Sequence, residues 1–246
     1  MHMVPKPRIT PDPLDALIVA LDGSPAEILA WGEQLEGIVR WVKVGMTGFY
    51  ADGAPLIAAL RERGFSVFLD LKMHDIPHQV EGAARSVARL GAQMVTIHAS
   101  GGSAMVRAAV SGAEQGAAEA GVIRPAILAV TVLTSMDGSA LREIGIREEP
   151  GRLVDTMART VIAAGADGIV CSPQESSWVR AAIGNDPLIV TPGVRPTWST
   201  TDDQARTLGP REALLAGASH LVVGRPITGA SDPAAAAVRV LDEMRG

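Results

Sequence analysis

Apolar runs rich in β-branched residues recur along the chain and alternate with segments of helical pattern. Eight such runs each predict a strand, and they lie at residues 17–22, 41–46, 65–72, 94–100, 126–133, 167–172, 187–194 and 220–227. Ala-, Arg- and Glu-rich segments between them predict helices at 54–64, 78–92, 151–166 and 204–218. A last helix is predicted to begin at Pro233, with Asp232 placed to cap its first turn.

Eight strand-and-helix units of about 30 residues each are typical of the (β/α)8 TIM barrel. The runs are apolar almost throughout, as expected of parallel strands that are covered on both faces. A doubly wound open sheet is the alternative, but the first run leads into "ALDGSPAE", without the G-x-G-x-x-G pattern that often follows the first strand of that fold. We therefore predict a single barrel domain over residues 14–246, preceded by an extended, proline-rich lead-in over 1–13.

Composition narrows the classes of function. Charged residues make up 20% of the 246 residues and aromatic residues 3%, the formal net charge is -5, and Lys and Arg are scattered along the chain. A nucleic-acid-binding surface would need clustered positive charge, and a membrane-spanning helix would need about 20 consecutive apolar residues, so we expect neither partner. The single cysteine, Cys171, lies in an apolar run, and we expect its thiol to be buried and inert. The N-terminus has no signal-peptide pattern, so we expect a soluble protein of the cytoplasm.

Charged residues stand at the ends of the first three predicted strands. Asp22 ends the first strand, Lys43 lies within the second, and Asp70 and Lys72 end the third. Side chains alternate along a strand, so Asp70 and Lys72 share a face with Phe68. If that face lines the barrel mouth, both charges enter one pocket. Lys43 lies between two valines and would need a carboxylate partner, which Asp22 or Asp70 could supply.

These charges have two possible interpretations. A network of ion pairs inside a barrel can do no more than neutralise polar groups, and a charged pair at a strand end is weak evidence of function. Three adjacent strands that contribute charges to one rim favour a catalytic site, because the chemistry of such barrels takes place at the carboxyl ends of the strands.

Glycine and arginine occur together after the last two predicted strands. Gly193 and Arg195 follow the seventh strand, and Gly224 and Arg225 follow the eighth. These two loops often form a phosphate site in (β/α)8 barrels, where glycine lets backbone N–H groups approach the anion and arginine adds charge-assisted hydrogen bonds. Either pair alone would indicate only a tight turn beside a surface arginine. Both pairs together favour a phosphorylated substrate.

The segment "DLKMHDIPHQV" at 70–80 resembles the D-x-K-x-x-D signature of the orotidine 5'-phosphate decarboxylase family, in particular its bacterial form. The likeness extends over nearly the whole chain after the lead-in and includes "ALD", "VKVG", "VTVLTSM", "TPGVRP", "DDQ" and "VGRPI" in the family's order. The resemblance implies a carboxy-lyase of de novo pyrimidine biosynthesis that converts orotidine 5'-monophosphate to UMP and CO2 without cofactor or metal. It also implies a homodimer with shared active sites.

The resemblance further implies a role for individual residues. Lys72 is the proton donor to C6 of the pyrimidine, Asp70 lies beside the substrate carboxylate, and Asp75 enters the neighbouring subunit's site to complete an array with Lys43. The substrate-binding residues implied are Asp22, Lys43, Ile76, Gln79, Thr134, Arg195, Gln204, Gly224 and Arg225. His78 and Gln79 depart from the pattern, because many members have Asn-Thr there.

Two alternatives stay open at this point. One is a metal-dependent phosphosugar decarboxylase or aldolase of the same barrel group, which resembles the D-x-K-x-x-D motif too. It would need carboxylates at the ends of other strands, and the second and fourth strands end in "VGMTGF" and "IHASGG", which offer none. The other is a non-catalytic barrel that binds a phosphorylated ligand and uses the charges only as an ion network.

Overall fold

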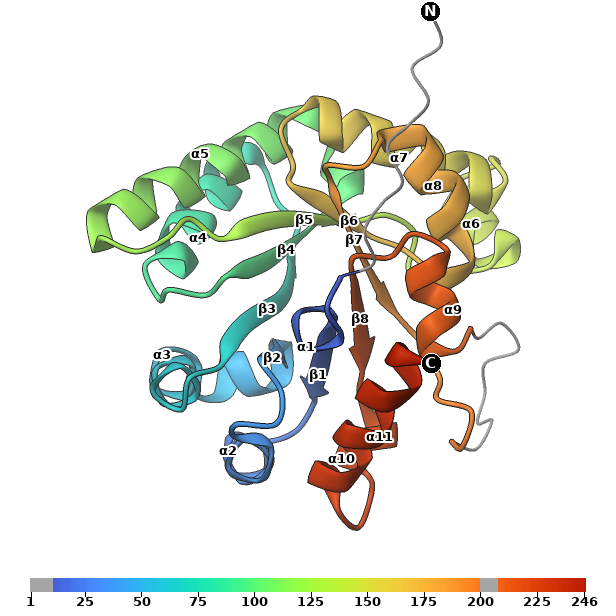
Figure 1. The fold of residues 1–246 in the computed structure, drawn as a ribbon. Coiled ribbons are helices and arrows are strands. Elements are labelled where there is room, and N and C mark those ends of the chain that lie inside the picture. The colour runs from blue at the N-terminus through green and yellow to red at the C-terminus, as the bar shows by residue number, and fades with distance from the viewer. Residues whose placement is uncertain (1–10, 200–207) are drawn as a thin grey trace, which may run out of the picture.

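The computed structural model of the chain describes residues 11–199 and 208–246. Eight parallel strands pair in sequence order, and β8 pairs with β1 to close a barrel around which the helices lie (Figure 1). The strands are β1 Leu17–Leu21, β2 Trp41–Gly45, β3 Ser66–Met73, β4 Met94–His98, β5 Ala126–Val130, β6 Gly168–Val170, β7 Leu188–Pro192 and β8 His220–Val223. The predicted single-domain (β/α)8 barrel is confirmed, with a strand at each of the eight apolar runs.

The helices alternate with the strands, as the polar segments predict. They are α1 Pro13–Ala16, α2 Pro25–Leu35, α3 Met46–Glu62, α4 Pro77–Ala88, α5 Gly102–Ala120, α6 Gly138–Glu143, α7 Pro150–Ala163, α8 Ser176–Ile183, α9 Pro210–Leu215, α10 Arg225–Thr228 and α11 Pro233–Arg245. Two short 3₁₀ helices, η1 Ala99–Gly101 and η2 Pro173–Glu175, follow β4 and β6. The predicted start of α11 is confirmed, because the Asp232 side chain accepts a hydrogen bond from the Ala235 N–H at 2.9 Å.

The helix predicted over 204–218 is wrong at its start. Residues 204–207 lie outside the described residues, and residues 208 and 209 are not helical. α9 begins only at Pro210, since proline has no N–H to donate to a preceding turn and is favoured at the first position of a helix. The Glu212 side chain accepts a hydrogen bond from the Gly209 N–H at 3.0 Å and so fixes this start.

Apolar side chains form one layer inside the barrel and a larger one between the strands and the helices. The inner layer consists of Ile18, Ala20, Phe68, Met94, Leu128, Val190 and Val222. Val67, Leu69 and Leu71 of β3 belong to the outer layer, so the predicted alternation along this strand is confirmed. The inner layer fills the barrel interior and leaves space for a site only above it, at the strand ends.

Residues before the barrel are described only in part. α1 begins at Pro13 and is capped by Asp12, whose side chain accepts a hydrogen bond from the Leu14 N–H at 2.8 Å. Residues 1–10 lie outside the described residues, so the division into a lead-in over 1–13 and a barrel over 14–246 stays a prediction.

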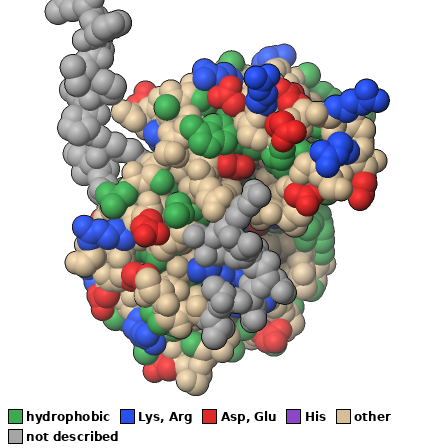
Figure 2. All heavy atoms as spheres, turned by 90° about the vertical axis from the view of Figure 1, so that its right-hand side faces the viewer, with side chains coloured by type: hydrophobic (Ala, Val, Ile, Leu, Met, Phe, Trp, Pro, Cys, Tyr) green, Lys and Arg blue, Asp and Glu red, His purple; other side chains and the backbone are tan. Residues whose placement is uncertain are grey.

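Two features of the whole molecule bear on possible partners. On the face shown in Figure 2, basic and acidic side chains are interspersed, in keeping with their scatter along the sequence. None of the helices in the described part of the chain is both long enough and apolar enough to cross a membrane.

The helices α4 and α5 lie side by side (Figure 1) and pack with their backbones almost in contact. A Cβ atom built on Gly112 of α5 would lie 2.1 Å from the Glu81 carbonyl oxygen of α4, and one on Gly116 would lie 2.1 Å from the Arg85 carbonyl oxygen. Two glycines one turn apart therefore allow this approach. The packing holds α4, which follows directly on the charged segment after β3.

We expect Gly112→Ala to lower the free energy of unfolding by about 1–3 kcal/mol, because its methyl group has no space beside the α4 backbone. Gly82→Ala is the matched control, since Gly82 lies in α4 and, apart from its own stretch of helix, no atom lies within 4 Å of the position of a Cβ. This control should gain up to about 1 kcal/mol from helix propensity. Urea unfolding measures both variants, and equal stability of the two would contradict the close packing.

Candidate active site

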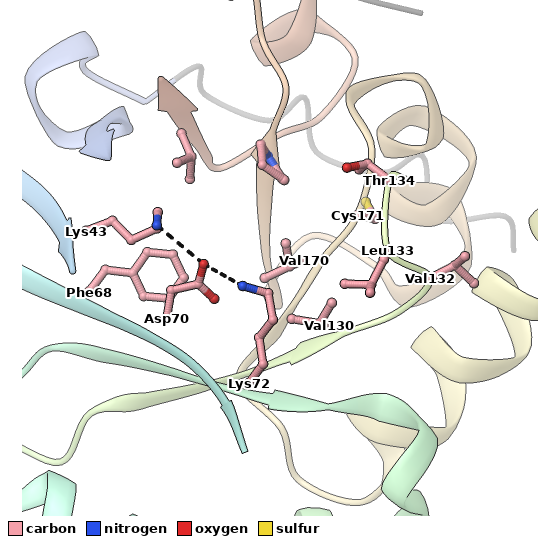
Figure 3. Close-up of a pocket in the computed structure, with 12 residues that line it drawn as sticks. Lys43, Phe68, Asp70, Lys72, Val130, Val132, Leu133, Thr134, Val170 and Cys171 are labelled. Carbon is pink, nitrogen blue, oxygen red and sulfur yellow. Dashed lines mark hydrogen bonds and ion pairs between the residues drawn. The ribbon is translucent and has the colours of Figure 1, made fainter. Parts of the chain in front are cut away.

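A cavity of about 200 Å³ opens at the carboxyl ends of the strands, above the inner apolar layer. Three of its lining residues carry charge, namely Lys43, Asp70 and Lys72. Its other walls are mainly apolar and include Phe68, Val130, Leu133 and Val170 (Figure 3), together with Pro192 and Val222. A few convergent charged groups in an otherwise apolar pocket are typical of a site for a small molecule.

The same three charged residues also line a second, adjoining hollow. This hollow is bordered by Leu21 and Asp22 at the end of β1 and by Gly45, Met46 and Thr47 at the end of β2. The charges therefore lie on the border between two spaces, one mainly apolar and one with more polar groups. Such a pair of spaces could hold a ring on one side and a polar substituent on the other.

The carboxylate of Asp70 lies between the two lysines (Figure 3). Its Oδ2 atom is 2.8 Å from Nζ of Lys72 and 3.5 Å from Nζ of Lys43. Lys43 also donates a hydrogen bond of 2.7 Å to Oδ1 of Asp22. The register explains this contact, because Lys43 pairs with Ala20 of β1 and so faces the barrel interior. The prediction that the buried Lys43 needs a carboxylate partner is confirmed, since both Asp22 and Asp70 pair with it.

Burial and charge act in opposite directions on Asp70. Burial by itself raises the pKa of Asp70, but the positive charges of Lys43 and Lys72, with hydrogen bonds from Lys72 and Thr96, outweigh it. The pKa of Asp70 therefore lies below its ordinary value, and the carboxylate stays ionised at neutral pH. An ionised Asp70 keeps the ammonium groups of both lysines at the cavity.

The backbone at Lys72 departs from a regular strand. The pairing of β3 with β4 shifts between Leu69 and Met73, and Lys72 has a φ of 49°. Among the described residues, Lys72 is the only non-glycine residue with a positive φ. A left-handed conformation costs a residue with a Cβ about 1–2 kcal/mol, so the surrounding structure has to hold Lys72 in place. Strain of this kind gathers at functional sites.

A sequence model of the orotidine 5'-phosphate decarboxylase / HUMPS family matches residues 15–240, nearly the whole barrel. The chain belongs to this family. It is 47% identical over 242 residues to an orotidine 5'-phosphate decarboxylase from Parasynechococcus marenigrum (strain WH8102), with 98% of each chain covered. It is 52% identical over 199 residues to an orotidine 5'-phosphate decarboxylase from Anaeromyxobacter sp. (strain K), covering 81% of this chain and 84% of that one.

Solved structures agree with the sequence comparison. The crystal structure of orotidine 5'-phosphate decarboxylase from Lactobacillus acidophilus matches with a TM-score of 0.84 and 41% sequence identity, covering 94% of this chain and 100% of that one. The resemblance of the D-x-K-x-x-D segment to the orotidine 5'-phosphate decarboxylase family, read from the sequence, is thereby confirmed.

Asp75, Ile76 and Gln79 are on the surface of the chain, and Asp75 forms no ion pair with the described lysines. They follow β3 and begin α4, and all three are exposed. The Asp75 side chain accepts a hydrogen bond from the Ile76 N–H at 2.7 Å. In the described part of the chain, the carboxylate within 4.0 Å of Nζ of Lys72 is that of Asp70. The single chain therefore does not bring Asp75 to its own Lys72.

The other predicted substrate-binding residues lie around the same end of the barrel. Thr134 lines the cavity from the loop after β5. Arg195 follows β7, Gly224 and Arg225 follow β8, and these two strands pair with each other. Among the described residues, the three are not part of the cavity wall. Gln204 lies outside the described residues.

Thr96 is a site residue that the sequence pattern did not predict. This residue of β4 is fully buried and donates a hydrogen bond of 2.9 Å to Oδ1 of Asp70. Its hydroxyl oxygen also accepts a hydrogen bond of 2.8 Å from the Lys72 N–H. A signal was available, since Thr96 shares its strand face with Met94 of the inner layer and is polar within an apolar run.

The histidines near the site do not gather with other metal donors. The rings of His74 and His98 lie 5.4 Å apart. Burial lowers the pKa of His98, and His74 and Lys72 lower it further, so its ring stays neutral at neutral pH. Within residues 11–199 and 208–246, no three His, Cys, Asp or Glu side chains lie close enough together to hold a metal ion.

Proposed function

We propose that this chain is a carboxy-lyase that converts orotidine 5'-monophosphate to UMP and CO2 in de novo pyrimidine biosynthesis, without a cofactor. The observation that carries the proposal is the ammonium of Lys72, held 2.8 Å from Asp70 at the border of an apolar cavity. Membership of the family supports the same substrate. The proposal includes the cytoplasm as its location, where the free thiol of Cys171 would stay reduced.

The reaction breaks the bond between C6 of the pyrimidine and its carboxylate carbon. CO2 leaves, the electron pair of the broken bond stays on C6, and no cofactor accepts it. The ammonium of Lys72 then stabilises this charge and gives a proton to C6, so that a C–H bond replaces the C–C bond. Lys72 is left neutral and regains its proton from solvent.

Asp70 would serve this reaction by fixing the two lysines. Its Oδ2 atom accepts from Lys72 and lies near Lys43, so both ammonium groups are in place before substrate arrives. We propose that the substrate carboxylate lies beside Asp70 in the enzyme–substrate complex. A site preorganised in this way needs little rearrangement as charge develops on C6.

The remaining predicted residues would bind the parts of the substrate that do not react. Asp22 and Lys43 would hold the ribose, and Thr134 would contact the base. Arg195, Gln204, Gly224 and Arg225 would bind the phosphate. The pairing of β7 with β8 supports the phosphate site, since it carries both glycine–arginine loops to one end of the barrel. Gly193 has a φ of 79°, which suits a tight turn after β7.

The proposal includes a homodimer in which Asp75 of each subunit completes the partner's site. Three observations support it. Asp75 is exposed and does not reach the lysine of its own chain, and Ile76 beside it is 64% exposed although it is apolar. Met46 and Tyr50, which follow the neighbouring strand β2, are also exposed apolar residues. Ile76 and Gln79 would contact the substrate from this second subunit.

The direct test is a spectrophotometric assay of the wild-type protein with orotidine 5'-monophosphate, with and without a chelator. We expect the ultraviolet absorbance of the substrate to fall at the same rate in both samples. An unchanged absorbance would overturn the function and favour a barrel that only binds a phosphorylated ligand. Loss of the activity on chelation would favour the metal-dependent relatives of this barrel group.

A further inference from the structure

The hydroxyl of Thr96, on the neighbouring strand β4, forms hydrogen bonds with both Asp70 and Lys72 of β3. The hydroxyl donates a hydrogen bond of 2.9 Å to Oδ1 of Asp70, and its oxygen accepts one of 2.8 Å from the Lys72 N–H. Asp70 in turn accepts from Nζ of Lys72 through its other oxygen at 2.8 Å. The three residues form a closed ring of contacts, which fixes both ends of Lys72 relative to one carboxylate.

The backbone of Lys72 depends on this hydroxyl. Between Leu69 and Met73 the strand leaves its regular pairing with β4, so the Lys72 N–H does not take part in the ladder there. The N–H is instead paired with the Thr96 side chain. A buried N–H without a partner is costly, and Lys72 is already in a left-handed conformation. The threonine hydroxyl therefore stabilises the local shape that aims Lys72 into the cavity.

Two other buried threonines of the barrel, Thr131 and Thr191, form hydrogen bonds of a different kind from those of Thr96. Thr131 donates to the Val170 carbonyl at 3.0 Å, and Thr191 donates to the His220 carbonyl at 3.4 Å. In each case the hydroxyl donates its hydrogen bond to a backbone carbonyl of the neighbouring strand. Thr96 is fully buried too, but it bonds to a side chain and a backbone group of the proposed catalytic pair.

We propose that Thr96 is a positioning residue for the decarboxylation, which sets the orientation of Asp70 and the backbone of Lys72 for proton transfer to C6. The inference rests on the proposed function of the site. Thr96 acts through the other two residues and makes no contact of its own with the reacting atoms. Its loss should therefore affect the chemical step more than the binding of substrate, whose phosphate and ribose are held elsewhere.

The test compares Thr96→Val, which keeps the shape and removes the hydroxyl, with Thr96→Ser, which keeps the hydroxyl. We expect Thr96→Val to lower kcat by about 10–100-fold, as a misplaced catalytic group does, with KM within about threefold of wild type. Thr96→Ser should keep kcat within about threefold. Thr191→Val is the matched control, because it removes a buried hydroxyl outside the site, and it should leave kcat unchanged.

Binding of UMP, followed by calorimetry, reports the folded fraction and the affinity of each variant. Thr96→Val should bind UMP with wild-type affinity. If Thr96→Val does not fold, Thr96→Cys takes its place, because the weak hydrogen-bonding thiol should lower kcat at least about tenfold relative to Thr96→Ser.

Three results would overturn the proposal. The first is a kcat near that of wild type for Thr96→Val, or for Thr96→Cys where that variant replaces it. The second is a Thr96→Ser variant whose kcat falls as far as that of Thr96→Val. The third is a loss of UMP affinity in Thr96→Val as large as its loss of kcat. A wild-type protein that leaves orotidine 5'-monophosphate unchanged would instead refute the proposed function. The two failures are thus distinguishable.

Discussion

Replacing Lys72 with alanine is expected to lower kcat/KM for the decarboxylation by at least about 10⁴-fold, because the variant loses both the proton donor and the positive charge beside C6. Either loss alone costs about 10²-fold or more. The fall in substrate absorbance measures the rate. A rate near that of wild type would contradict the proposed mechanism.

Loss of Lys72 should leave the fold intact, which makes the comparison informative. Alanine has the same Cβ as lysine, so the left-handed backbone at this position gains no new strain, and Asp70 keeps Lys43 as a partner. We expect the variant to bind UMP. Arg63→Ala is a control, since it removes an exposed ion pair with Glu36 and should retain wild-type activity.

Mixing Lys72→Ala subunits with Asp75→Asn subunits is expected to restore activity that neither variant has alone. In a mixed dimer, one site combines the intact Lys72 of one subunit with the intact Asp75 of the other. Random exchange makes half of the dimers mixed, and each has one intact site of two, so about a quarter of the wild-type rate should return. The assay follows substrate absorbance after the two proteins are unfolded and refolded together.

A second mixture serves as the control for the first. Asp70 and Lys72 lie in the same chain's site, so Lys72→Ala mixed with Asp70→Asn leaves both sites of every dimer defective. This mixture should stay inactive. No recovery in the Asp75 mixture, or equal recovery in both mixtures, would contradict the shared site.

Alternation along strands predicted much of the site. Phe68, Asp70 and Lys72 share the inner face of β3 as expected, because side chains on a strand alternate and the inner layer requires the apolar one. The burial of Lys43 with carboxylate partners also follows from its two valine neighbours. These features depend only on local periodicity and on the cost of burying a charge.

The rest depends on backbone geometry that a periodic pattern does not contain. The register shift after Leu69 and the positive φ of Lys72 interrupt the regular pairing of β3 with β4 at the point where the proposed chemistry takes place. Thr96 reaches Asp70 and Lys72 only because of this shift. The start of α9 was missed for a related reason. The helical pattern that predicted a helix over 204–218 runs across Pro210, but proline has no N–H to donate to a preceding turn, so α9 begins only there.

The central claim is that an ammonium at position 72 gives its proton to C6, and chemical rescue tests it most directly. Lys72→Cys should be inactive, and treatment with 2-bromoethylamine should add an aminoethyl group to the introduced thiol by displacing bromide. Cys171 is 1% exposed, and burial raises the pKa of its thiol, so it should not react. We predict that this treatment raises the rate of Lys72→Cys at least about 100-fold and leaves wild type unchanged. A modified protein that stays inactive, or a Lys72→Cys variant that is active before treatment, would contradict the account.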